Sequence, residues 1–422
     1  MVKKTFSAPI SHITDGLNEI NKLSKFERLA RYFWLFGPFL MLIERTPADA
    51  WISLLVIFFV IRSFVVSDFR WLRVFWVKAA FGFWLVCIFS SAISDDPLYS
   101  IGEAIVWFRF PLFAIASAYW LAINRKILLL MFYSVGGGMI AMCFILAAEL
   151  LIVGQQYSRL SWPYGDLVPG NYLAKACLPA FLLLIAIATS TRGKSSVQSC
   201  VLAVVTLLFS VAAGERINFL IRACSGMLAG LVWRPIWWKY LVLIGIELTA
   251  VGVAIGSKPK VLDRFVANFI EQLPVHADSL YFRAMMPGVL AFKESPWFGI
   301  GTGNFRNMCG QITRGTNGLD CHPHPHNFYI QLAAETGLVG LFAGVTFIGA
   351  LFWYTLQGVI KHRHDVVAAT AFIPVLAFFW PIASTSDFFG QWNNCFMWSA
   401  LAISLSWRSS ISKVSSHSQP ME

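Results

Sequence analysis

Apolar runs close to the length needed to cross a lipid bilayer recur along most of this 422-residue sequence, and they restrict what the chain can fold into. A transmembrane helix needs roughly 20 predominantly apolar residues. Hydrophobic residues make up 57% of the chain and charged residues 13%, whereas a soluble domain carries roughly 25% charged residues. The sequence therefore predicts an all-α, polytopic membrane protein.

We expect about twelve transmembrane helices, of which the first two are short and could form one broken helix. The polar residues 1–29 and 408–422 are expected to be tails, and the first tail lacks the pattern of a cleaved signal peptide. One long segment, residues 257–335, separates nine spans in residues 30–256 from three in residues 336–407. The expected spans lie near 30–46, 50–66, 76–94, 104–123, 127–153, 168–189, 197–213, 218–235, 238–256, 336–357, 366–385 and 390–407.

Positively charged residues indicate the orientation of these spans. With an even number of spans both termini share one side, and the short loops of that side carry most of the lysines and arginines, including Arg62, Arg125 and Lys126. The opposite short loops carry few, such as Arg45. By the positive-inside rule, both termini are expected in the cytoplasm and residues 257–335 outside it. This bias explains most of the net charge of +11, so no nucleic-acid partner is expected.

The long segment, residues 257–335, has features of its own, and long loops are usually functional. It carries more basic than acidic residues, which would suit an anionic ligand. The stretch "DSLYFRAMMPGVLAFKESP" predicts a short amphipathic helix, and the glycine-rich "WFGIGTGNF" follows it. This G-x-G-x-G pattern lacks the context of a dinucleotide site, so a tight turn is the simpler interpretation. Cys309 and Cys321 both lie in this segment, and a disulfide between them is plausible if the segment is periplasmic.

Three histidines alternate with prolines in "LDCHPHPHNFYIQLAAETGLVG", residues 319–340. The prolines favour extended geometry at His322 and His324. His326 lies at or near the start of the helix that follows, where the helix dipole keeps an imidazole neutral and free N–H groups suit a phosphate oxygen. Three interpretations stay open, namely a H-x-H-x-H metal site whose closure the prolines restrict, a polar loop at the membrane surface, and a catalytic base beside a phosphorylated donor.

Polar and cationic residues near this segment extend the candidate site. Asn327, Gln331 and Glu335 have helical spacing and form a polar stripe. Arg216 lies where two expected spans turn on the outer side, so it and Arg283 could grip one anion with their planar forks of donors. Three further ionisable residues are expected at membrane depth, namely Arg109, Lys175 and Arg222. Ionisable residues there usually face a polar cavity or a partner, and an internal salt bridge is the alternative for Arg109.

Four stretches together resemble one family. "CHPHPHNFYIQLAAETGLVG" is similar to a His-Asn helix start, "YFRAMMPGVLAFKESPWFGIGTGNF" to an arginine-bearing loop helix with a glycine turn, "GERINFL" to an arginine turn, and "STSDFFGQWNN" to a late outer loop. In this order of features the chain resembles the O-antigen ligase and O-antigen polymerase superfamily of polytopic membrane glycosyltransferases, with similar topology along residues 30–407. Glu215 departs from the family pattern, which often has Ser or Thr there.

The resemblance implies a GT-C-like fold in the bacterial cell inner membrane, with a periplasmic active site. It implies a glycan donor on undecaprenyl diphosphate, with Arg216 and Arg283 binding the diphosphate and His326 activating the acceptor hydroxyl. Transfer would invert the anomeric carbon and need neither a metal ion nor another cofactor. Further substrate contacts would come from Arg109, Lys175, Arg222, His324, Asn327, Gln331, Glu335 and Asp387.

The acceptor stays open at this point. A ligase would transfer the glycan to lipid A–core, and a polymerase would transfer it to another lipid-linked repeat. The basic long segment favours an anionic core acceptor, and hence the ligase, by electrostatic steering. A transporter or flippase of an anionic lipid is a further alternative, in which intramembrane cations line the pathway. We find no convincing internal repeat of the kind that such folds often show.

Overall fold

The computed structural model describes residues 9–154, 160–161, 168–233, 236–256, 259–265, 271, 278–316, 318–362 and 364–416. In these ranges the regular elements are helices, without a strand. The helices of the first half are α2 (Pro9–Asn21), α3 (Lys25–Ile43), α4 (Arg45–Val65), η1 (Arg70–Arg73), α5 (Phe75–Ala92), α6 (Pro97–Trp107), α7 (Arg109–Ala116), η2 (Ser117–Leu121), α8 (Arg125–Ile152), α9 (Val168–Asn171), η3 (Tyr172–Ala176), α10 (Leu178–Ser190) and α11 (Lys194–Ala212). Those of the second half are α12 (Arg216–Trp233), α13 (Trp237–Gly256), α14 (Pro259–Phe265), α16 (Leu280–Glu294), α17 (Phe305–Ile312), α18 (Phe328–His362), α19 (Val366–Thr370), α20 (Phe372–Phe378) and α21 (Gln391–Ser416).

Within the described ranges, seven helical segments are long and apolar enough to cross a bilayer, and a bent pair of helices would make an eighth. They are α4, α5, Pro97–Leu121, α8, α11, α13 and α18, with Val168–Ala176 and Leu178–Ser190 as the bent pair. The protein is therefore an all-helical, polytopic membrane protein. The expected spans lie on one helix or on adjoining helices, with one exception. The span expected over residues 366–385 is helical only as far as Phe378, because residues 379–385 form no helix. The number of helices that cross the membrane stays a prediction. The first two expected spans are separate helices, α3 and α4.

Prolines explain why three expected spans are divided. A proline removes the hydrogen bond to the carbonyl four residues earlier and its ring clashes with that carbonyl. Pro111 follows the break between α6 and α7, and Pro374 follows the break between α19 and α20. Pro179 follows the bend of 55° between η3 and α10. The apolar pattern is continuous across these positions, so hydropathy alone predicts one span where the backbone forms two or three helical segments.

The glycine-rich turn packs against a kink in α18. The backbone N–H groups of Ile300 and Gly301 donate to the carbonyls of Ala334 and Glu335 at 3.0 and 2.9 Å. Gly337 interrupts α18 with φ 65° and ψ −167°. A Cβ on Gly299 would lie 2.3 Å from the carbonyl carbon of Glu335. The turn therefore has a packing role, which agrees with its simpler interpretation.

Replacing Gly337 by alanine is expected to lower the melting temperature of the detergent-solubilised protein strongly. Its backbone angles are accessible almost only to glycine, which costs another residue about 1–3 kcal/mol, and the new Cβ would lie 2.2 Å from the carbonyl carbon of Trp297. Gly349 is the matched control, since it lies on the same helix with open space around its Cα. Gly349→Ala should leave the melting temperature unchanged or slightly raised; equal melting temperatures for both variants would contradict the prediction.

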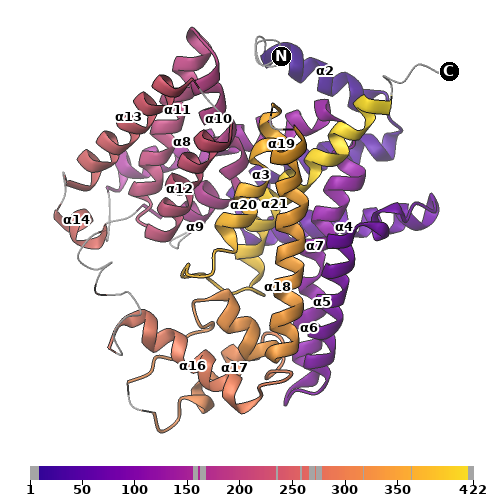
Figure 1. The fold of residues 1–422 in the computed structure, drawn as a ribbon, viewed down its shortest axis with the longest axis vertical. Helices are drawn as coiled ribbons and strands as arrows, with labels where there is room; N and C mark the ends of the chain where they lie inside the picture. Colours follow the sequence, from indigo (N-terminus) through magenta and orange to yellow (C-terminus); the bar gives the residue numbers. More distant parts are fainter. Residues whose placement is uncertain are drawn as a thin grey trace.

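The helices place the long segment at one end of the molecule (Figure 1). In the view of Figure 1, α16, α17 and the start of α18 form a layer at the bottom, whereas α2 and the last turns of α21 lie at the top. The helices α10 to α13 form one side of the molecule, and α5 packs along α18 on the other. Residues 257–335, expected as one long loop, thus contain α14, α16, α17 and the first turns of α18, and they lie partly outside the described residues.

Candidate active site

An apolar groove of about 500 Å³ runs between α12 and α20 and reaches α16. Tyr281 and Met285 of α16 line the groove. Trp380 and Ser384, from the segment that follows α20, line it as well. Among the described lining residues Arg216, the first residue of α12, alone carries a charge. The groove therefore combines a hydrocarbon wall with one guanidinium group. The other lining residues are Ile217, Leu220, Ile221, Cys224, Ser225, Leu228, Ile373, Leu376, Ala377, Ile382 and Ala383.

The three histidines gather into a cluster beside this groove. The ring centroid of His326 lies 4.5 Å from that of His324 and 5.2 Å from that of His322. It also lies 6.2 Å from the ring centroid of Tyr281. Because Tyr281 lines the groove, the histidine cluster and the groove adjoin each other at this ring.

Local backbone geometry fixes the position of His326. Asn327 caps α18, because its side-chain oxygen accepts from the N–H groups of Tyr329 and Ile330 at 3.0 and 3.2 Å. Its amide nitrogen donates to the carbonyl of Pro381 at 2.8 Å. His326 precedes this cap in a left-handed conformation, with φ 55°. Its carbonyl accepts from the N–H of Thr385 at 2.8 Å, so the groove-lining segment after α20 is attached to the start of α18.

Burial keeps the imidazole of His326 uncharged at neutral pH. Burial, together with repulsion of a positive charge by His324 and His322, lowers the pKa of His326 to about 4. Burial also lowers the pKa of His324 below its ordinary value, against an opposing effect of Asp387. A neutral imidazole can accept a proton, so the ring has the protonation state that a general base requires.

A buried polar network lies next to the histidines. The amide nitrogen of Gln331 donates to Asp387 at 2.7 Å and to Glu335 at 3.3 Å. The second oxygen of Glu335 accepts from the N–H of Gly303 at 2.8 Å. Arg306 on α17 forms an ion pair with Asp387. The predicted stripe of Asn327, Gln331 and Glu335 is therefore buried and directed inward, and Asp387 joins it from a distant part of the chain.

Arg306 is the component of this network that the sequence analysis did not select. Its partner Asp387 lies 81 residues away, and nothing in the local pattern pairs them. One local signal was available, since Arg306 stands on a short helix directly after the glycine turn and three residues before Cys309. Such a position beside two constrained elements could have marked it as a candidate.

Two hydroxyl groups near the cluster are buried. The side-chain oxygens of Thr385 and Ser386 are buried without a hydrogen-bond partner among the described residues. Native proteins rarely leave buried polar atoms unpaired, so such atoms in a cleft suit a ligand. Both residues follow the groove-lining Ser384, and this position is compatible with a polar head group at the groove.

Arg283 has a different environment from the groove-lining residues of its helix. It forms an ion pair with Asp320 at 2.8 Å, with 35% and 31% of the two side chains exposed. Tyr281 and Met285 are four residues apart and share a face of α16, whereas Arg283 lies midway between them in sequence and so on the opposite face. The structure therefore directs Arg283 toward the segment before the histidines.

The remaining predicted cations have partners inside the helical bundle. Arg109 forms an ion pair with Asp49 at 3.0 Å, which is the internal salt bridge that the sequence left open. Lys175 donates to the side-chain oxygen of Asn393 at 2.6 Å. Arg222 is fully buried and donates to Ser210 at 3.1 Å. Among the described residues the groove lining includes none of these three cations.

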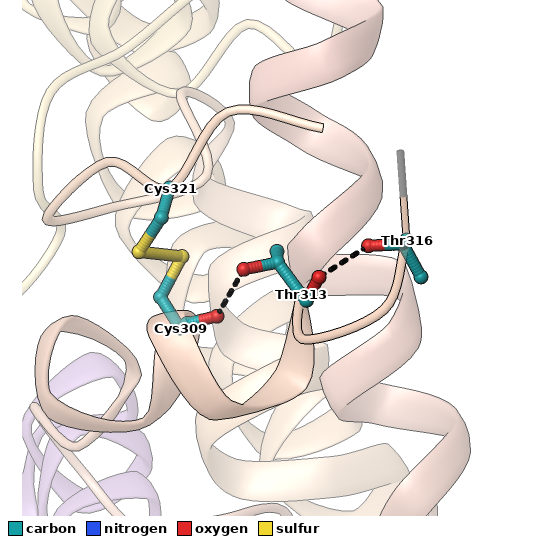
Figure 2. Close-up of a disulfide and its surroundings, with 4 residues drawn as sticks. All are labelled: Cys309, Thr313, Thr316 and Cys321. Carbon is teal, nitrogen blue, oxygen red and sulfur yellow. Dashed lines mark hydrogen bonds between the residues drawn. A yellow bond between two sulfur atoms is a disulfide. The ribbon is translucent and has the colours of Figure 1, made fainter. Parts of the chain in front are cut away.

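Cys309 and Cys321 form a disulfide bond (Figure 2). It links α17 to the residue that precedes His322. No group of three or more His, Cys, Asp or Glu side chains in the described part of the chain has an arrangement that could hold a metal ion.

The fold and the site together define a polytopic membrane protein with an amphiphilic groove beside a cluster of histidines. Residues 178–345 match the family model described as O-antigen ligase. This match supports the O-antigen ligase family, as the sequence motifs predicted. It extends from α10 into α18, so it includes Arg216, Arg283 and His326, whereas Asp387 lies beyond it. The comparison with curated proteins gives no match.

At a coarse level, the family indicates glycosyl transfer of the O-antigen ligase type in a membrane, with lipid-linked glycans as substrates.

Proposed function

We propose that this protein transfers a glycan from undecaprenyl diphosphate to lipid A–core at the periplasmic face of the cell inner membrane. The observation that carries the proposal is the contact between the apolar groove, with Arg216 in its lining, and the neutral imidazole of His326 across Tyr281. A polyprenyl diphosphate has a hydrocarbon chain and an anionic head. The groove offers it a hydrocarbon wall and one cation, next to a base.

In this proposal the donor binds through its lipid and its diphosphate. The polyprenyl chain occupies the groove between α12 and α20, and the guanidinium of Arg216 binds the diphosphate with two parallel N–H donors. Arg283, which lies on the face of α16 opposite Tyr281 and Met285, contributes a second cation when its side chain leaves Asp320 and turns toward a phosphate oxygen. That ion pair is partly exposed, and exposed ion pairs stabilise proteins little, so the exchange costs little.

His326 then acts as the general base. Its imidazole takes the proton of the acceptor hydroxyl, the acceptor oxygen forms a bond to the anomeric carbon, and the bond from that carbon to the phosphate oxygen breaks. Undecaprenyl diphosphate leaves with the electron pair, and the in-line geometry inverts the anomeric configuration. The bound diphosphate also raises the pKa of His326 from its low value, because a neighbouring anion favours imidazolium. Donor binding thereby strengthens the base.

The acceptor sugar is expected to contact the polar network. Carboxylate and amide groups of Asp387, Gln331 and Asn327 offer hydrogen bonds to sugar hydroxyls. So do the buried hydroxyls of Thr385 and Ser386, which have no hydrogen-bond partner among the described residues. The basic residues of the long segment attract an anionic core. This electrostatic argument favours lipid A–core over a second lipid-linked repeat as the acceptor.

The direct test offers purified protein a lipid-linked glycan together with either lipid A–core or a second lipid-linked glycan. We expect the glycan to appear on lipid A–core. Growth of the lipid-linked chain instead would identify a polymerase. Movement of the donor across a vesicle membrane without a new glycosidic bond would identify a transporter and overturn the proposal.

Transfer in this assay is expected to persist at an unchanged rate in excess EDTA. Arginine side chains, rather than a divalent ion, stabilise the charge of the leaving diphosphate in this proposal. The measurement is the initial rate with and without chelator, followed by separate addition of Mg²⁺, Mn²⁺ and Ca²⁺. A loss that one of these ions restores would contradict the prediction and favour the metal interpretation of the histidines.

A further inference from the structure

The disulfide between Cys309 and Cys321 connects two parts of the candidate site. The Cα atoms of its cysteines are 5.6 Å apart at a sequence separation of 12. Cys309 lies on α17 one turn after Arg306, whose ion pair with Asp387 belongs to the polar network. Cys321 directly precedes His322. The covalent bond therefore ties the histidine loop, residues 321–326, to the helix that carries Arg306.

The α17 side of this bond is firmly held. Cys309 is fully buried in a small hydrophobic cluster of its own, which is separate from the main core. Its carbonyl accepts from the N–H of Thr313 at 3.0 Å and from the Thr313 hydroxyl at 2.9 Å (Figure 2). Packing thus fixes this cysteine whether or not the disulfide forms. The other buried members of the cluster are Ala291, Ile300, Phe305, Ile312 and Ala334.

The histidine loop, in contrast, has few hydrogen bonds to the rest of the protein, and its packing is concentrated at its far end, where the buried Pro325 lies against Gly288 of α16. Residues 321–325 make no backbone hydrogen bond to any described residue, and Pro323 and Pro325 have no N–H to donate. Before the loop, the Asp320–Arg283 ion pair is partly exposed and accompanied by one long backbone hydrogen bond of 3.4 Å. At its far end, His326 is held through its carbonyl by Thr385. Without the disulfide, the end of the loop at Cys321 would be held only by the contacts between Asp320 and Arg283, which solvent weakens.

We propose that the Cys309–Cys321 disulfide is a redox-dependent positioning element that holds the histidine loop in its active arrangement, and that its reduction switches transfer off. This inference rests on the proposed function, and it adds a condition under which the site works. Disulfides persist outside the cytoplasm, where the long segment is expected to lie. The site would therefore become active only after the segment has been exported and oxidised.

The redox step has a defined direction of attack. On formation, the two thiols lose two protons and two electrons to the disulfide of a thiol oxidant, which becomes a dithiol. On reduction, the thiolate of a dithiol attacks a sulfur atom and forms a mixed disulfide before the second thiol releases the pair. Cys321 is exposed and Cys309 is buried, so attack occurs at the sulfur of Cys321 and Cys309 leaves as the thiolate.

The expected effect is on the rate of the chemical step. Reduction displaces His322 and His324, whose positions affect the environment of His326, and small displacements of this kind lower kcat by about 10²-fold. The donor groove is built on α12 and α20, and the disulfide attaches to neither helix. The KM for the lipid-linked donor should therefore change little.

The test compares oxidised and dithiothreitol-treated full-length protein in the glycan transfer assay. We expect kcat to fall on reduction and to recover on reoxidation. The Cys309→Ala/Cys321→Ala double variant should have the low kcat in both conditions, and Cys200→Ser, which replaces a free cysteine of α11, should behave as the wild type. Full kcat in the reduced wild type or in the double variant would overturn the inference. So would a loss of helical circular dichroism on reduction, because the lower rate would then reflect unfolding.

A second measurement separates this inference from the proposed function. If the oxidised wild type transfers no glycan, the proposed function fails, but the loop can still be probed by diethyl pyrocarbonate. We expect reduction to raise the rate at which His322 and His324 are modified, as read by mass spectrometry. His364, an exposed histidine after α18, is the internal reference. Equal rates in both redox states would show that the disulfide does not position the loop.

Discussion

Replacing His326 by alanine is expected to lower the rate of glycan transfer by about 10²- to 10⁴-fold, the usual contribution of a positioned general base. His326 is the histidine that contacts the groove-lining Tyr281, at a centroid distance of 6.2 Å. It is also held by the hydrogen bond from Thr385 and by the cap that follows it. Alanine removes the ring without removing these backbone contacts, so the protein should insert and fold normally.

The pH dependence of transfer provides a finer test of the same residue. The pKa of His326 is lowered to about 4 by burial and by His324 and His322, so the ring is neutral above that pH and becomes inactive as the pH falls through it. The acid limb of kcat/KM reports the free enzyme and should therefore lie near pH 4 rather than near 6.5. The acid limb of kcat reports the donor complex and should lie higher, because the diphosphate favours imidazolium.

His364→Ala is the matched control, since His364 is exposed and follows the far end of α18. It should show normal transfer and both acid limbs of the wild type. Normal smooth lipopolysaccharide in a strain whose only copy carries His326→Ala would exclude the proposed role of the base. Coincident acid limbs for kcat and kcat/KM would leave the base possible but contradict its coupling to the donor.

Local sequence signals predicted the helical architecture well. The apolar runs correspond to helices because membrane-length apolar segments have few other structures available. His326 was expected at or near the start of a helix, and α18 begins two residues later, at Phe328, with Asn327 as its cap. These features depend on residues close in sequence, and their steric and hydrogen-bonding causes act within one or two turns.

The partners of charged residues could not be predicted in the same way. Arg109 pairs with Asp49 across 60 residues, and Arg306 pairs with Asp387 across 81. Which acid meets which base depends on how the helices pack, and apolar periodicity does not encode the rotation and offset of one helix against another. For the same reason, the sequence could not predict the partners of Arg216 and Arg222. They lie on one helix, yet Arg222 is buried against Ser210 while Arg216 lines the groove.

Replacing Arg216 by alanine is expected to lower transfer by about 10²- to 10³-fold, the usual effect of removing one donor from a site that stabilises developing charge. Arg216 is the charged member of the described groove lining, so alanine leaves the diphosphate beside a hydrocarbon wall. Lysine keeps the charge but lacks the planar fork of donors, so Arg216→Lys should retain a small part of the activity. The measurement is kcat and KM for the lipid-linked donor in each variant.

The second arginine allows the diphosphate site to be divided between its two cations. Arg283→Ala should also lower transfer, and Arg283→Lys should lower it less. Because Arg283 is ion-paired with Asp320, Asp320→Asn separates two roles: it should preserve transfer if Arg283 binds phosphate, and it should reproduce the Arg283→Ala loss if Arg283 serves to hold Asp320. Arg192, exposed between α10 and α11, is the matched control, and Arg192→Ala should be fully active. If Arg216→Ala matched that control, the groove would have no role in binding the anionic head, and the donor would have to bind elsewhere on the protein.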